Sequence, residues 1–267
     1  MNMKKILITG GSGFIGTNFI NFLSKKKIQI LNIDKLSSIS TKEKFKKIYF
    51  KKNYTFIKYD LKDPYSIYSI LKKFNPHFII NFAAESHVDR SITDPIYFIK
   101  NNIMTSTNLF YAFSMMSNKN KIKFFHISTD EVYGSIKKGS FKEKNSYNPS
   151  SPYSASKGSA DLIAESFNKT YNTNIKILNL TNNYGPYQFP EKFIPTLIFH
   201  FLKNKAAPLY GNGKYFREWM HVSDSCEAIW NVMKLNKKFD RMNIGTEKRY
   251  SNSEILKIVF NLMKSKN

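Results

Sequence analysis

Three polar residues, Thr129, Asp130 and Glu131, stand at the end of an apolar run in the stretch HISTDEVYGS, residues 126–135. A hydroxyl and two carboxyl groups presented together can act on one substrate if their surroundings keep one acid neutral and the other ionised. The alternative is a solvated loop in which the charges have no chemical role. The choice depends on whether neighbouring segments supply a substrate and a cofactor.

A tyrosine and a lysine lie four residues apart in YSASK, which places Tyr153 and Lys157 one turn apart on the same face of a predicted helix. A neighbouring ammonium group favours the phenolate, so we expect Lys157 to lower the pKa of Tyr153. The tyrosine could then take a proton from a substrate hydroxyl. This spacing also arises by chance in a lysine-rich chain, where an exposed helix pair is the alternative.

A glycine-rich loop, TGGSGFIGTN, follows a predicted strand near the N-terminus and opens a predicted helix. Glycines let the backbone approach a pyrophosphate, and the helix N-terminus offers amide donors and partial positive charge. Asp34 ends the second predicted strand, where a carboxylate can bind the adenosine ribose and repel a 2′-phosphate. The pattern therefore predicts an NAD site, with a simple glycine turn as the alternative. Asp60 ends a third apolar run and is either a cofactor contact or a turn aspartate.

Short apolar runs alternate with longer helix-like stretches through the first two thirds of the chain. The predicted strands cover residues 4–10, 28–34, 54–60, 77–86, 121–129 and 174–182, and the predicted helices cover residues 17–27, 66–74 and 154–171. This alternation indicates an α/β fold, a Rossmann-like doubly wound parallel sheet. We expect an NAD-binding domain over 1–184 and a smaller substrate-binding lobe over 185–267, because the proline-rich stretch YGPYQFPEKFIP interrupts regular structure.

Composition limits the classes of protein to consider. The chain of 267 residues has 42% hydrophobic residues and a net charge of +23, which comes from lysines spread along its whole length. Such a distribution favours solvated lysines over a nucleic-acid surface. The start of the chain indicates neither a signal peptide nor a membrane span. One cysteine, Cys226, and five histidines without ligand spacing predict no metal site and a cytoplasmic protein.

Five longer motifs carry a family resemblance: NFAAESHVDRSI, ISTDEVYG, SPYSASK, NNYGPYQFPEKFIP and REWMHVSD. Together with the glycine loop, they resemble the dTDP-glucose 4,6-dehydratases, a family of the extended short-chain dehydrogenase/reductase superfamily, up to about residue 256. The adjacent acids distinguish this family from its sisters. Nucleotide-sugar epimerases generally lack both acids, and sugar-nucleotide decarboxylases and GDP-mannose dehydratases tend to keep the glutamate after a serine.

The resemblance implies a lyase that converts dTDP-glucose to dTDP-4-keto-6-deoxyglucose and water. It implies that Tyr153 takes the proton of the 4-hydroxyl, which Thr129 helps to hold, while the 4-hydride passes to a tightly held NAD+. Glu131 then removes the proton on carbon 5, and Asp130, kept protonated, donates to the departing 6-hydroxyl. The return of the hydride to carbon 6 regenerates NAD+.

The same resemblance assigns the remaining site residues and a homodimer. The cofactor residues are Gly10, Gly11, Gly13, Phe14, Ile15, Gly16, Asp34, Lys35, Asp60, Leu61, Ala83, Asn101, Tyr153, Lys157 and Asn183. The substrate residues are Ser86, Thr129, Asn182, Lys192, Phe193, Pro208, Tyr210, Arg217 and Asn252. Arg217 can grip a diphosphate with two donors, and its alternative role is an ion pair with Glu218. His87 is expected to be a packed, hydrogen-bonded histidine without a catalytic role.

The chain departs from this family at its C-terminal end. The family usually continues beyond the SNSEIL stretch to a segment that contributes to the nucleotide pocket, whereas this chain ends at Asn267 and is apparently truncated. We therefore expect cofactor binding to be kept and turnover of the sugar nucleotide to be reduced. The alternatives are a dehydratase or decarboxylase of another nucleotide sugar and a non-catalytic NAD-binding homologue.

Overall fold

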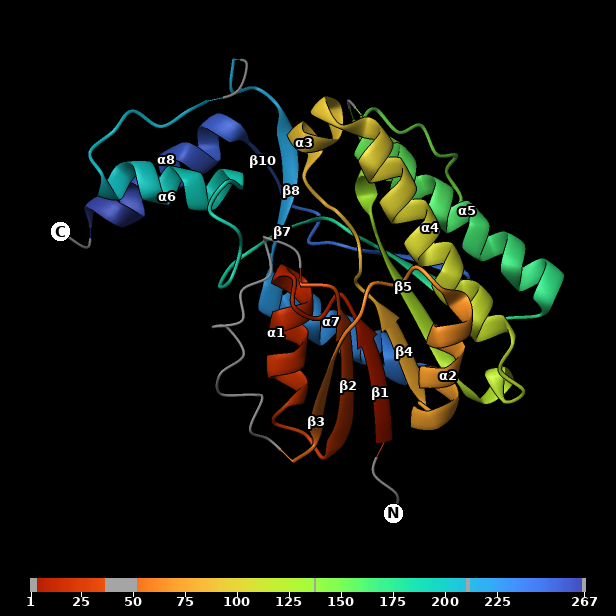
Figure 1. Cartoon of the computed structure of the whole chain (residues 1–267). Coiled ribbons are helices and arrows are strands. Elements are labelled where there is room, and N and C mark those ends of the chain that lie inside the picture. Colours follow the sequence, from red (N-terminus) through yellow and green to blue (C-terminus); the bar gives the residue numbers. More distant parts are fainter. Residues whose placement is uncertain (1–3, 37–51, 137, 210–211, 266–267) are drawn as a thin grey trace.

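A seven-stranded parallel sheet forms the centre of the described part of the molecule (Figure 1). The computed structural model describes residues 4–36, 52–136, 138–209 and 212–265. In spatial order the strands are β3 (Tyr54–Lys58), β2 (Ile28–Asp34), β1 (Lys4–Thr9), β4 (Phe78–Asn81), β5 (Lys123–Thr129), β6 (Ile175–Leu180) and β9 (Arg241–Ile244). The order of the strands reverses between β1 and β4. In a doubly wound sheet, ligands bind beyond the carboxyl ends of the strands at this reversal.

Helices cover both faces of this sheet, as Figure 1 shows. One face carries α1 (Phe14–Leu23) and α7 (Val222–Lys234), and the other carries α2 (Pro64–Phe74), α4 (Pro95–Ser114) and α5 (Pro152–Tyr171). Alternate residues of a strand point to opposite faces. Ile6 and Ile8 of β1 therefore pack with the α1 and α7 side chains, and Leu7 packs with Phe110 of α4. The predicted Rossmann-like sheet is confirmed.

The helices that border the site begin at defined caps. Asp94 accepts the Tyr97 N–H at the start of α4, and His87 accepts the Arg90 N–H at the start of the short helix α3 (Val88–Thr93). A capping box of Ser151 and Ser154 begins α5. These caps satisfy the free N–H groups of the first turn. The start of α5 is therefore fixed, and Tyr153 lies in its first turn.

A small lobe lies beside the carboxyl edge of the main sheet (Figure 1). Its three-stranded sheet has the order β10 (Arg249–Ser251), β8 (Phe216–His221) and β7 (Asn182–Tyr184). The helices α6 (Phe193–Leu202) and α8 (Asn252–Lys264) pack together around Ile194, Leu197 and Ile255. Two single 3-10 turns, η2 (Lys119–Lys121) and η3 (Asp130–Tyr133), precede and follow β5.

The expected division into residues 1–184 and 185–267 does not follow the two sheets. Strand β7, which ends at Tyr184, belongs to the lobe, whereas α7 and β9 from the second segment belong to the large domain. The physical reason is that β9 completes the edge of the sheet beside β6, where Ile177 pairs with Arg241. The apolar side of α7 is buried against α1, so α7 also belongs to the large domain.

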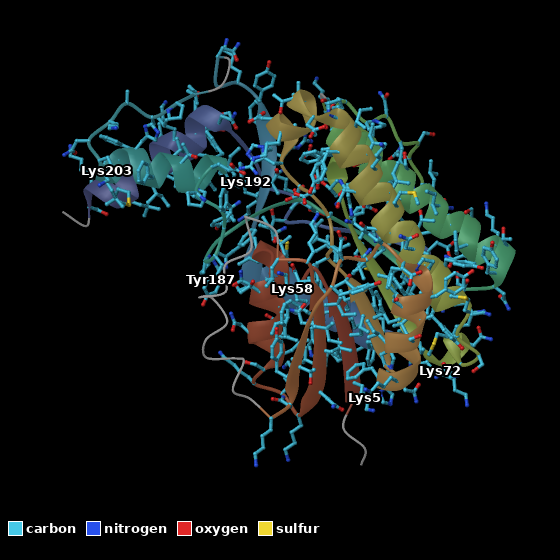
Figure 2. All side chains as sticks on the ribbon, in the orientation of Figure 1. Lys5, Lys58, Lys72, Tyr187, Lys192 and Lys203 are labelled. Carbon is cyan, nitrogen blue, oxygen red and sulfur yellow. The ribbon has the colours of Figure 1, made fainter. Side chains whose placement is uncertain are left out.

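The lysines occupy many parts of the surface. Figure 2 shows Lys203 on the small lobe and Lys5 and Lys72 at the opposite end of the molecule, whereas Lys192 lies between the lobe and the main sheet. In the described ranges, the helices are all too short or too polar to cross a membrane.

Candidate active site

The glycine loop between β1 and α1 forms a tight cradle. Gly10 has a φ of +69°, and a Cβ placed there would lie 2.5 Å from the backbone nitrogen of Ala83. A Cβ on Gly16 would lie 2.5 Å from the carbonyl oxygen of Gly10. Side chains are therefore excluded at both positions, and the start of α1 comes close to the end of β1. This is the local structure that lets a pyrophosphate approach helix amides.

The carboxylate of Asp34 is held at the edge of the cradle. Its two oxygens accept the backbone N–H groups of Ser12 at 2.9 Å and Leu36 at 2.8 Å. Burial raises the pKa of Asp34, while these hydrogen bonds oppose the rise. The fixed carboxylate has the chemistry to accept hydrogen bonds from a ribose, and it would repel a phosphate group there. The cradle and Asp34 together fit an NAD-type dinucleotide.

One cleft collects most of the residues predicted to bind the cofactor. Its lining includes Gly10, Gly13, Phe14, Asp34, Lys35, Asp60, Leu61, Ala83 and Asn101. Lys35 pairs with Glu85 at 2.9 Å and bonds the side-chain oxygen of Asn101 at 2.9 Å, so these residues form one wall. Gly11 is buried in the loop and Gly16 in the first turn of α1, and Ile15 packs against the core. Asn183 lies away from this lining, where its side chain bonds the Thr181 carbonyl at 2.9 Å.

The lining also contains residues that the sequence did not assign to the cofactor. Glu85, Thr105, Gln188, Phe189 and Glu191 are among them. Two predicted substrate residues, Ser86 and Lys192, line this cleft as well, and the Lys192 ammonium donates to the Ser86 carbonyl at 2.7 Å. The motif NNYGPYQFPEKFIP contains residues 185–192, but it did not indicate that Gln188, Phe189 and Glu191 line the cofactor cleft, because that depends on how this segment folds back over the sheet.

The two acids of the TDE motif lie directly beyond β5, in η3. The Asp130 carboxyl accepts the Thr129 hydroxyl at 3.3 Å and the Thr181 hydroxyl at 3.2 Å. Burial, followed by the charge of Glu131, raises the pKa of Asp130 to about 7. Burial also raises the pKa of Glu131, but Arg217 and Lys192 oppose that rise. The surroundings therefore favour a proton on Asp130 and a negative charge on Glu131.

Tyr153 lies close to Thr129, whose hydroxyl acts to lower the pKa of Tyr153. The expectation that Lys157 lowers the pKa of Tyr153 is wrong for the protein alone: burial, then the charges of Glu131 and Asp130, raise it. The Lys157 ammonium bonds instead to the Ile127 carbonyl at 2.7 Å. Burial lowers the pKa of Lys157 to about 8.

A second cleft begins at the acid pair and extends under the lobe. Asp130, Glu131, Asn182 and Arg217 line it. The Glu218 carboxylate accepts backbone N–H groups of residues 246 and 247, so the alternative of an Arg217–Glu218 ion pair is not what the structure has. The sequence did not assign two further cations in this lining, Lys214 and Arg249.

Besides Ser86 and Lys192, four predicted substrate residues in the described part of the chain are absent from the lining of this second cleft: Thr129, Phe193, Pro208 and Asn252. Phe193 stacks on Trp219 with ring centroids 6.1 Å apart, and the backbone of Asn252 bonds Tyr215 at the start of α8. Pro208 lies outside the lining of both clefts. Tyr210 lies outside the described residues.

Two further predictions concern single residues near the cofactor cleft. His87 is hydrogen-bonded, as expected: its Nδ1 accepts the Arg90 N–H at 3.3 Å, and its Nε2 lies 3.2 Å from Glu191. Asp60 lines the cleft and also pairs with Lys62 at 3.1 Å.

Comparison with known proteins identifies the family. The family model described as GDP-mannose 4,6 dehydratase matches residues 7–267. The probable dTDP-glucose 4,6-dehydratase of Sinorhizobium fredii is 39% identical over 259 residues, which are 94% of this chain and 74% of the relative. The chain belongs to the dTDP-glucose 4,6-dehydratase family. Its members are enzymes, and this chain is a dehydratase of that family.

Solved structures of the family have the same fold. The crystal structure of dTDP-glucose 4,6-dehydratase from Bacillus anthracis, in complex with NAD, has a TM-score of 0.88 and 36% identity, covering 98% of this chain and 81% of that one. The dTDP-glucose 4,6-dehydratase from Streptomyces venezuelae, solved with NAD, has a TM-score of 0.91 and 33% identity, covering 97% of this chain and 81% of that one.

Proposed function

We propose that this chain converts dTDP-glucose to dTDP-4-keto-6-deoxyglucose and water, with NAD+ retained through the cycle. The observation that carries the proposal is the adjacent pair Asp130 and Glu131, which lines the second cleft, with Thr129 and Tyr153 beside it. Their different electrostatic surroundings suit an elimination, which needs an acid and a base at adjacent carbons.

A bound NAD+ would supply the acceptor for a hydride from carbon 4 and, in its reduced form, the donor of that hydride to carbon 6. The glycine loop, Asp34 and Lys35 would hold it. The Tyr153 phenolate takes the proton of the sugar's 4-hydroxyl, and Thr129 orients that hydroxyl. Because the pKa of Tyr153 is raised by burial and two carboxylates, this proton transfer depends on Lys157 and on a positive charge nearby.

The acid pair carries out the loss of water. A ketone at carbon 4 makes the proton on carbon 5 acidic, and Glu131 removes that proton. Asp130 gives its own proton to the 6-hydroxyl, which leaves as water, so that a double bond forms between carbons 5 and 6. Arg217 and Lys192 keep Glu131 ionised before the step and bind the diphosphate side of the substrate.

Retention of the cofactor is supported by the loop of residues 185–192. Its Pro186 carbonyl accepts the Asn18 amide from α1 at 2.8 Å, and Glu191 pairs with Arg90 at 2.6 Å on the opposite side of the cleft. The loop also contributes Gln188 and Phe189 to the cleft lining. A dinucleotide beneath this loop can leave only when these contacts break.

A homodimer through α4 and α5 forms part of the proposal. The two helices pack side by side on one outer face of the molecule (Figure 1). Ile96 and Met104 of α4 and Leu162 of α5 are 60%, 54% and 55% exposed. Exposed apolar side chains on two packed helices favour association with a second copy of the chain. The single cysteine, Cys226, is buried, which suits the reducing conditions of the cytoplasm.

The test is incubation of the purified protein with NAD+ and, in parallel, dTDP-, UDP- and GDP-glucose. We expect the dTDP sugar to lose the mass of one water and to give the 4-keto-6-deoxy product without net formation of NADH. Product from UDP- or GDP-glucose alone would replace the proposed substrate by another nucleotide sugar. Cofactor binding with no product from any sugar would leave a non-catalytic NAD-binding protein.

A further inference from the structure

A chain of buried polar side chains lies behind the site and ends at Asp161. Asp161 follows Lys157 by one turn of α5, and His126 of β5 lies against both. Asp161 and His126 are 0% exposed, and Lys157 is 3% exposed. None of the three lines either cleft. Charged and titratable groups are costly to bury, so their arrangement needs a physical reason.

The protonation of His126 follows from its neighbours. The side-chain oxygen of Asn81 accepts the Ala83 backbone N–H at 3.0 Å and the Thr9 hydroxyl at 2.7 Å, so the Asn81 amide nitrogen faces His126. That nitrogen donates to Nδ1 of His126 at 3.0 Å. Burial and the charge of Lys157 hold the pKa of His126 well below its usual range, so the ring is neutral and its proton is on Nε2.

This tautomer directs the ring toward Asp161. Nε2 of His126 lies 3.5 Å from Oδ1 of Asp161 and 3.5 Å from the Lys157 ammonium nitrogen. An N–H at Nε2 cannot accept a bond from Lys157, which donates to the Ile127 carbonyl instead. Among the described residues, Oδ1 of Asp161 has no hydrogen bond of normal geometry, and Nε2 of His126 approaches it only to this longer distance.

The other oxygen of Asp161 is well satisfied. Oδ2 accepts the Ser128 hydroxyl at 2.6 Å and the Tyr147 hydroxyl at 2.9 Å. Arg241 of β9 lies over the Tyr147 ring and adds a positive charge on that side. These donors and the Lys157 ammonium favour the ionised carboxylate against the cost of burial.

We propose that Asp161 is a positioning residue that keeps Lys157 a buried cation beside Tyr153 by supplying its counter-charge. The proposal rests on the proposed function for its catalytic meaning, since Tyr153 needs a cation nearby to act as a base. Burial alone pulls the pKa of Lys157 downward, and Asp161 is the group that opposes this pull. Asp161 therefore acts on the substrate only through Lys157.

The decisive experiment titrates Lys157 directly. Protein with ¹³C-labelled lysine is followed by NMR from about pH 6 to 10, and the Lys157 signal is identified by its absence in K157M. In the unaltered protein we expect a pKa of about 8. In D161N we expect it to fall by at least about one unit, which corresponds to about tenfold less cation at pH 9. An unchanged titration in D161N would overturn the proposal.

The matched control is E165Q, which removes one carboxylate from the next turn of the same helix. Glu165 pairs with Arg241 rather than with Lys157, so the Lys157 titration should stay in place. An equal fall in both variants would show a general charge effect and also overturn the proposal. If D161N does not fold, Y147F removes one donor to the Asp161 carboxylate and should lower the Lys157 pKa by a smaller amount.

Turnover supplies the second readout. At pH 9 we expect D161N to lower kcat about tenfold and to change KM for the sugar nucleotide less than about twofold, because Asp161 lines neither cleft. A displaced Lys157 titration in a protein that turns over no sugar would refute the proposed function and leave the role of Asp161 intact. Normal turnover with an unmoved titration would refute the role of Asp161 alone.

Discussion

Replacing Asp130 with asparagine changes activity and stability in opposite directions. The rise in the pKa of Asp130 from 3.8 to about 7 means that the folded protein binds this proton more tightly than the unfolded chain. The ionised carboxylate therefore costs the folded state up to about 4 kcal/mol above pH 7. The sign follows from linkage: between about pH 4 and pH 7 the folded state holds more protons, so this group's contribution to stability falls as pH rises. Asparagine has the same shape and no charge, so D130N should remove that fall.

The same substitution should stop the elimination. An amide nitrogen can donate a hydrogen bond to the 6-hydroxyl but cannot transfer a proton to it. We expect the dehydration rate of D130N to fall at least about 100-fold, the usual worth of a general acid. In the unaltered protein, turnover should fall about tenfold for each pH unit above 7, as Asp130 loses its proton.

The assay is urea unfolding of both proteins at pH 5, 7 and 8, together with product formation at the same pH values. The unaltered protein should lose stability relative to D130N between pH 5 and 7, and the difference should level off above pH 8. Asp161, whose pKa is also raised, is present in both proteins, so its contribution cancels in the difference. Glu131 repels the Asp130 carboxylate, and D130N removes that repulsion, which adds to the expected gain in stability above pH 7. A D130N protein that is less stable at pH 8 would refute the electrostatic reasoning. Undiminished dehydration by D130N would refute the assignment of Asp130 as the acid.

Three more predictions test other parts of the site. G16A should weaken NAD binding and lower the free energy of unfolding by about 1–3 kcal/mol, because its Cβ would meet the Gly10 carbonyl. Calorimetry measures the NAD affinity and thermal melting measures the stability. An unaltered NAD affinity would contradict the role given to the glycine cradle. E191Q should release bound NAD several-fold faster, because Glu191 pairs with Arg90 and His87 and so joins the loop of residues 185–192 to the rest of the molecule. Exchange with labelled NAD measures the release rate. An unchanged rate would show that the loop does not retain the cofactor. R217K should raise KM for the sugar nucleotide about tenfold and leave kcat nearly unchanged, because lysine cannot donate the two parallel hydrogen bonds that arginine gives to a diphosphate. A change in kcat alone would show that Arg217 acts in the chemical step instead.

Local sequence patterns were sufficient to predict the cofactor cradle and the positions of the acidic and tyrosine side chains along the chain. The glycines every third residue, the carboxylate at the end of β2 and the tyrosine in the first turn of α5 are each set by residues close in the chain. The hydrophobic alternation predicted the doubly wound sheet because each strand and helix carries its own periodicity. The roles of Asp130 and Glu131 were accessible only through a family resemblance, and they stay a proposal.

The sequence by itself determined which groups stand at the strand ends and helix starts, because backbone periodicity and capping act over a few residues. Only the tertiary structure decided what surrounds them. It placed Lys192 and Ser86 on the cofactor cleft, returned α7 and β9 to the main sheet, and put His126 between Lys157 and Asp161. It also raised the pKa of Tyr153 where the spacing predicted a fall. Burial and neighbouring charge come from segments far apart in the chain, so charge states and cavities depend on the folded whole.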